Sequence, residues 1–197
     1  ELTLPEIFTA ENSSYNLASY GKWHLGGGTT GPLDLGGWTQ FSGILGGGVG
    51  NYTDWSKTVN GVTEPENVTT YTTTDQVDDA VSFISGQTTD PWFVWIGFNA
   101  PHDPFHNPPT VVPALEDYPD YPTTDGEVTG ANRRFAYEAA LQALDTEIGR
   151  LLASVDLDNT NIILIGDNGT PGAVVQAPYS LSLYTSPSPR DVEESRM

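Results

Sequence analysis

The sequence predicts an α/β protein with a mainly parallel sheet between helices. Two short, continuous apolar runs, 91–98 and 161–166, are typical of strands buried inside a parallel sheet. Two segments with helical periodicity, 74–86 and 131–155, alternate with these runs. This helix–strand–helix–strand order is characteristic of α/β architecture, and no internal repeat or internal domain boundary interrupts it.

The N-terminal elements are predicted from capping residues and composition. Thr3 is expected to cap a short helix over 3–10, with Glu6 as its capping-box partner. Residues 15–25 are expected to form a strand or extended segment that runs into a glycine-rich loop.

The middle of the chain is predicted to be mostly loop before the first long helix. Gly, Thr and Asn are frequent in 26–70, where short strands are expected around Phe41 and Val59. In the helix over 74–86, three apolar side chains share one face, and Gly86 ends the helix. These side chains are Val77, Val81 and Ile84.

The second long helix, over 131–155, is predicted to bury a stripe of mostly large apolar side chains. The stripe comprises Phe135, Ala139, Leu141, Leu144, Ile148, Leu151 and Leu152. Before it, residues 99–128 are rich in proline and are expected to be irregular.

The composition excludes several classes of function. The chain has 26 acidic and 7 basic residues, a formal net charge of −19, so it lacks the basic face that a nucleic-acid partner requires. No apolar run approaches the ~20 residues of a membrane-spanning helix, and no membrane partner is expected. Because there is no cysteine, disulfides, thiol catalysis and zinc–thiolate sites are excluded.

Lys22 and His24 form the first candidate site, in a segment that ends in glycines. Residues i and i+2 of a strand project from the same face, so these two side chains are expected to lie together. A cation beside an imidazole suits an anionic tetrahedral group, because one supplies charge and the other a proton. The alternative is an edge strand with a solvated lysine and a half-buried histidine.

The second candidate site follows the strand predicted over 91–98. Ligands of open α/β sheets bind beyond the carboxyl ends of strands, where His102 and His106 are expected to lie. The alternative is a proline-rich connector whose histidines cap local backbone, and this fits His106 better than His102.

Asp167 and Asn168 form the third candidate site, directly after the strand predicted over 161–166. They offer two hard oxygen ligands, which suit Mg²⁺ or Ca²⁺. The alternative is a tight Asp-Asn-Gly turn, a common connection after a strand.

Four ordered segments of the chain resemble motifs of the sulfatase family, and the resemblance covers roughly residues 1–178. They are Gly-Lys-Trp-His-Leu-Gly at 21–26, Ala-Pro-His-Asp-Pro at 100–104, the helical segment 137–149 and Gly-Asp-Asn-Gly at 166–169. The resemblance implies an alkaline-phosphatase-like fold, with a mixed, mainly parallel sheet, and part of the N-terminal catalytic domain. It also implies the hydrolysis of sulfate esters, with a sulfated small molecule or carbohydrate as the partner.

The same resemblance implies a role for each candidate residue. Lys22 would contact the sulfate ester and the oxygens of the nucleophile, and His24 would orient a formylglycine nucleophile. His102 would bind sulfate and donate a proton to the departing alcohol. Asp167 and Asn168 would ligate a divalent cation, Ca²⁺ in most relatives with Mg²⁺ as the alternative.

Some parts of the family pattern are missing from this sequence. The Cys/Ser-x-Pro-x-Arg motif that yields formylglycine, and the upstream Asp-Asp pair that completes the metal site, are not in the chain. The lysine expected shortly after Gly169 is also missing, and Ser14-Tyr15-Asn-Leu17 departs from the usual Gly-Tyr-x-Thr. We therefore expect an internal, catalytically inactive fragment of a secreted or periplasmic sulfatase.

Residues 179–197 are expected to be a non-native tail. The segment 184–191 resembles the translation of a common sequencing-library adapter, and 195–197 resembles the translation of the adapter segment after the sample index. The alternative is a Ser/Pro-rich disordered terminus.

Two other functions remain open for the full protein. One is a phosphomonoesterase or phosphodiesterase of the same superfamily, which shares the metal site. The other is a non-catalytic relative that binds sulfated glycans after losing the nucleophile.

Overall fold

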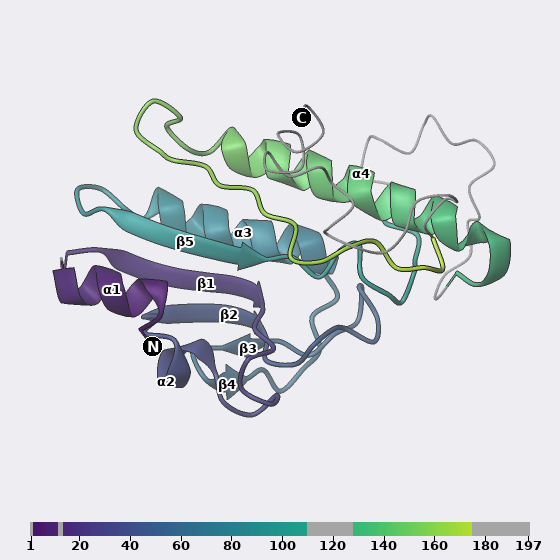
Figure 1. Ribbon diagram of the computed structural model, residues 1–197, viewed down its shortest axis with the longest axis horizontal. Helices are drawn as coiled ribbons and strands as arrows, with labels where there is room; N and C mark the ends of the chain where they lie inside the picture. The colour runs from purple at the N-terminus through teal and green to yellow at the C-terminus, as the bar shows by residue number, and fades with distance from the viewer. Residues whose placement is uncertain (1, 12–13, 110–127, 175–197) are drawn as a thin grey trace, which may run out of the picture.

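The computed structural model describes residues 2–11, 14–109 and 128–174, so the tail predicted over 179–197 lies outside the described residues. At its centre is a mixed five-stranded sheet of order β4-β3-β2-β1-β5 (Figure 1). Strand β1 pairs in parallel with both of its neighbours, β2 and β5, whereas β3 pairs antiparallel with β2 and with β4. The strands are β1 (Asn16–Lys22), β2 (Gln40–Ile44), β3 (Thr58–Val59), β4 (Val62–Thr63) and β5 (Trp92–Gly97).

Helices cover both faces of this sheet, which confirms the predicted α/β class. The helices are α1 (Leu4–Glu11), α2 (Pro32–Leu35), α3 (Thr72–Ser85) and α4 (Arg133–Leu152), the last preceded by a 3₁₀ turn at Gly130–Asn132. On β5, the ring of Phe93 lies 5.1 Å from that of Phe8 in α1, whereas the next residue, Val94, packs with Ala80 of α3. Since successive strand residues face opposite ways, α1 and α3 lie on opposite faces.

The predicted cap of the first helix is present in the structure. The Glu6 carboxylate accepts a hydrogen bond from the Thr3 amide at 2.7 Å, and the Thr3 hydroxyl accepts one from the Glu6 amide at 3.4 Å. These reciprocal bonds form a capping box. They also lower the pKa of Glu6, because hydrogen bonds to Thr3 favour its charged form.

The buried face of α4 differs from the predicted stripe. Phe135 and Leu141 are 48% and 39% exposed, whereas the helix buries its alanines. Small side chains allow the backbone of α4 to lie close to that of α3. The face of α4 that is buried is therefore the one with the small residues and not the one with the largest apolar residues. The buried residues of α4 are Ala136, Ala139, Ala140, Ala143 and Glu147. Within the described residues, no helix is both long and apolar enough to cross a membrane.

The prediction of a buried strand over 161–166 is wrong. The segment forms no strand, and its apolar side chains Ile162 to Ile165 are 53–82% exposed. A strand requires a neighbour that satisfies its backbone groups, and β5 pairs only with β1 within the described sheet. The other apolar run, over 91–98, does form β5, but as an edge strand whose Trp95 is 45% exposed rather than as a fully buried strand.

Candidate active site

The candidate residues from the first two motifs lie where three parallel strands end. β2, β1 and β5 are adjacent, with Gly21 of β1 level with Gly43 on one side and Gly97 on the other. Lys22 is the last residue of β1, and the chain continues from it to His24. Beyond β5, the chain leads to His102. The segments that carry Lys22 and His102 therefore leave the sheet at the same edge, where the sequence pattern predicts only the second of them.

Close backbone contact at this edge requires glycine. Gly43 has a φ of +155°, and a Cβ on it would lie 2.0 Å from the carbonyl oxygen of Gly21. A Cβ on Gly97 would lie 2.7 Å from the carbonyl oxygen of Lys22. A side chain at these positions would therefore push the strands apart just below the candidate site.

Two histidines meet the same loop after β2. A Cβ on Gly47 would lie 2.6 Å from the ring atom Cε1 of His24, and a Cβ on Gly48 would lie 3.8 Å from Nδ1 of His102. The imidazoles of His24 and His102 therefore approach consecutive glycines, although 78 positions separate these two histidines in the sequence.

The strand argument that placed Lys22 and His24 on one face is wrong. β1 ends at Lys22, and His24 has a left-handed backbone with a φ of +57°. The amide of His24 donates to the carbonyl of Leu45 at 3.1 Å, which holds the turn. His24 is exposed, and its position depends on this turn and on Gly47 rather than on strand alternation.

His102 is held through one ring nitrogen. Its Nδ1 lies 2.6 Å from the carboxylate of Asp103 and 2.8 Å from the carbonyl of the same residue. A histidine that donates from Nδ1 to a carboxylate presents Nε2 to a ligand. The sequence interpretation did not single out Asp103, although its position directly after His102 in Ala-Pro-His-Asp-Pro was a signal for it.

His106 has a structural role, as the alternative interpretation of its segment proposed. It is 8% exposed, and its Nε2 lies 2.8 Å from the hydroxyl of Tyr71. Its Nδ1 lies 3.0 Å from the carbonyl of Pro104, and its ring stacks on that of Tyr52 with centroids 3.8 Å apart. Burial lowers the pKa of His106 to about 4.

This pKa predicts a stability change between about pH 4 and 6.5. In that range an unfolded His106, with a pKa of 6.5, binds a proton that the folded one excludes, so the free energy of unfolding falls as the pH drops. The full loss is on the order of 3 kcal/mol. Thermal unfolding of the wild type and of His106→Gln tests this prediction. The difference in Tm between the wild type and His106→Gln should shrink as the pH falls. A difference that stays constant would show that His106 does not titrate this way.

Asp167 and Asn168 are both exposed, and the Asn168 amide donates to the carbonyl of Gly169 at 3.0 Å. Their oxygen donors fit a hard cation, but two residues supply only part of the roughly six to eight ligands that Ca²⁺ takes. The described residues contain no group of three or more His, Asp or Glu side chains that could hold a metal ion. A metal site built on Asp167 and Asn168 would therefore need further ligands.

Comparisons with known proteins agree on one family. The sequence model of the Sulfatase family matches residues 1–180. The "Uncharacterized sulfatase YdeN" of Escherichia coli (strain K12) is 26% identical over 211 residues, covering 92% of this chain and 35% of that protein. The chain thus spans about a third of the length of this relative.

Solved structures show the same fold at low sequence identity. The crystal structure of Ps i-CgsB has a TM-score of 0.58 and 20% identity, over 76% of this chain and 35% of that one. Its complex with k-i-k-neocarrahexaose scores 0.56 at 21% identity, over 75% and 35%. The protein BT33494S-sulf, described with glycosaminoglycan metabolism in Bacteroides thetaiotaomicron, scores 0.56 at 16% identity, over 76% and 37%.

Proposed function

Because this chain belongs to the sulfatase family, we propose that the protein containing it is a sulfuric ester hydrolase. The observation that carries the proposal is the approach of His24 and His102 to consecutive glycines, at the strand ends where Lys22 also lies. A cation and two imidazoles at one place suit a tetrahedral anion. Membership of the sulfatase family supports a sulfate ester as that anion.

The chemistry assigns one task to each of these side chains. Hydrolysis breaks the sulfur–oxygen bond of the ester, yielding an alcohol and sulfate, and charge develops on the oxygens of both. Lys22 stabilises the charge on the sulfuryl oxygens. His102, oriented by Asp103 at Nδ1, donates a proton from Nε2 to the departing alcohol oxygen. His24 orients the nucleophile, and the formylglycine used by the family would supply the attacking oxygen.

Asp167 and Asn168 are proposed as two ligands of a divalent cation, with Ca²⁺ preferred over Mg²⁺. Their oxygen donors support a hard cation, which would neutralise charge on the sulfuryl oxygens. Removing metal from the full-length protein with EGTA should abolish hydrolysis, and Ca²⁺ should restore it. Full activity in EGTA, or recovery with Mg²⁺ alone, would contradict the assignment to calcium.

We further propose a sulfated carbohydrate as the substrate and a location outside the cytoplasm. The first rests on the structural neighbours described with neocarrahexaose and with glycosaminoglycans. The second rests on the family resemblance and is checked by fractionating cells that produce the protein. Recovery of the protein in the cytoplasm would contradict it.

A comparison of matched esters tests the proposed reaction. The full-length protein is assayed with 4-nitrophenyl sulfate, with 4-nitrophenyl phosphate and with a sulfated oligosaccharide, and released sulfate and phosphate are measured. We expect sulfate release, with much slower release of phosphate. Faster phosphate release would indicate a phosphoesterase, whereas binding of the sulfated oligosaccharide without hydrolysis would indicate a glycan-binding relative.

A further inference from the structure

One side chain from a distant loop contacts the segment that carries His102. Tyr52 lies between β2 and β3, and its hydroxyl is 2.8 Å from the carbonyl oxygen of Asn99 and 2.8 Å from that of His102. The amide of His102 also donates to the Asn99 carbonyl, at 2.9 Å. The single phenolic proton is therefore shared between the two carbonyls that begin and end the turn leading to His102.

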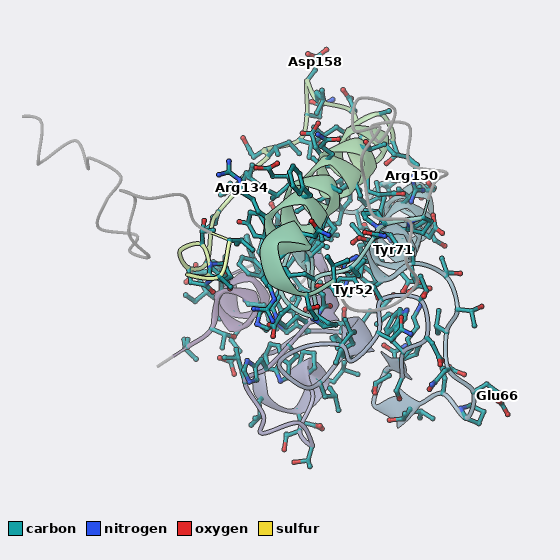
Figure 2. All side chains as sticks on the ribbon, turned by 90° about the vertical axis from the view of Figure 1, so that its right-hand side faces the viewer. Tyr52, Glu66, Tyr71, Arg134, Arg150 and Asp158 are labelled. Atoms are coloured by element: carbon teal, nitrogen blue, oxygen red, sulfur yellow. The ribbon has the colours of Figure 1, made fainter. Side chains whose placement is uncertain are left out.

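The ring of Tyr52 contacts the same segment farther along. It stacks on the ring of His106 with centroids 3.8 Å apart and 18° between the planes. Tyr52 thus contacts the segment at two places, by its hydroxyl at Asn99 and His102 and by its ring at His106, and only the hydroxyl reaches the backbone of His102. Figure 2 shows Tyr52 close to Tyr71, and both pack in one cluster with Ala143 of α4.

Tyr52 is itself firmly held. It is 2% exposed, and its carbonyl accepts hydrogen bonds from both the amide and the hydroxyl of Thr72, at 2.8 and 2.9 Å. Burial, together with Tyr71 and Asp103, raises the pKa of Tyr52 well above its ordinary value, so the hydroxyl keeps its proton at any physiological pH. The first turn of α3 therefore fixes a permanent donor beneath the His102 turn.

From these contacts we propose that Tyr52 is the positioning residue of His102. Its hydroxyl sets the backbone of His102, Asp103 sets the ring at Nδ1, and together they aim Nε2 at the leaving-group oxygen. This inference rests on the proposed sulfatase function. It adds Tyr52, a residue of a glycine-rich loop outside the four segments that resemble sulfatase motifs, and assigns it an effect on the substrate only through His102.

A misplaced proton donor slows the hydrolysis of an ester most when the leaving group of that ester must be protonated. An alkyl alcohol is a poor leaving group that must be protonated, whereas 4-nitrophenolate leaves without a proton. Tyr52→Phe removes only the hydroxyl and keeps the stacked ring. In the full-length protein we expect it to lower kcat for an alkyl or sugar sulfate by about 10–100-fold and for 4-nitrophenyl sulfate by less than about 3-fold. KM is expected to stay within about 2-fold for both esters.

Tyr71→Phe is the matched control. It removes another buried phenolic hydroxyl, one that bonds to His106 instead of to the backbone of His102. Both variants should lower Tm, but only Tyr52→Phe should change the ratio of the two kcat values. If Tyr52→Phe lowers kcat equally for both esters, or if Tyr71→Phe changes the ratio of the two kcat values to the same extent, Tyr52 acts through general stability alone.

A double-mutant cycle with His102→Ala tests whether Tyr52 acts through His102. In the His102→Ala background, Tyr52→Phe should change kcat for the alkyl ester by less than about 2-fold, because the group it positions is absent. A further 10-fold loss would overturn the assignment. The proposed function fails separately, if the wild-type protein releases no sulfate from either ester.

Discussion

Replacing His102 by alanine is expected to lower kcat for an alkyl sulfate ester by about 10²–10⁴-fold, the range typical of losing a general acid. The loss with 4-nitrophenyl sulfate should be much smaller, because its leaving group needs no proton. His102 is half exposed at the strand ends, so its removal leaves the core unchanged. Initial rates with the two esters in the full-length protein measure the effect.

His106→Gln is the control for this prediction. His106 lies four residues farther along but is buried against Tyr52 and Tyr71. The control variant should be less stable yet keep its kcat per folded molecule. The role assigned to His102 is wrong if His102→Ala lowers kcat equally for both esters. It is also wrong if His106→Gln shows the same dependence of kcat on the leaving group as His102→Ala.

Replacing Lys22 by methionine is expected to reduce kcat/KM for sulfate esters by about 10²–10³-fold, as when one preorganised group that stabilises transition-state charge is removed. The methionine keeps most of the length of the side chain but removes the cation. Because the chain has a net charge of −19, a sulfate group depends on such local positive charge at the site. Steady-state kinetics of the full-length protein measure the loss.

Arg134→Met controls for the overall loss of one positive charge. Arg134 is an exposed residue of α4 that pairs with Glu138, and pairs of this kind contribute little to stability. This variant should keep its kinetics. An equal loss of kcat/KM in Arg134→Met and Lys22→Met would show that net charge, and not the placement of Lys22, supports the reaction.

The sequence predicted that His102 follows the end of a buried strand, and the topology explains why the segment with Lys22 and His24 reaches the same edge. Parallel strands end at one edge of the sheet, so motifs that follow β1 and β5 meet wherever those strands pair. The same reasoning failed for His24, because its position depends on a left-handed turn beyond the end of β1. Strand alternation applies only while the strand continues.

Other features depend on partners that local sequence does not reveal. Tyr52 lies in a loop without periodicity, and its partner His102 is 50 positions away. The buried face of α4 consists of four alanines and Glu147, because α3 packs closely against it. A prediction from hydrophobic periodicity instead selects the larger apolar residues of this helix. Ile162 to Ile165 have the composition of a buried strand, but without a paired strand their composition alone does not bury them.

A crystal structure of the full-length His102→Ala variant with an intact sulfate ester tests the central claim most directly. We predict that the sulfate group lies at the ends of β1, β2 and β5, within hydrogen-bonding distance of the Lys22 ammonium. His24 should lie beside the nucleophile, and the alcohol oxygen should face the position vacated by the His102 ring. A sulfate group bound elsewhere, with Lys22 and His24 directed away from it, would contradict the proposed site.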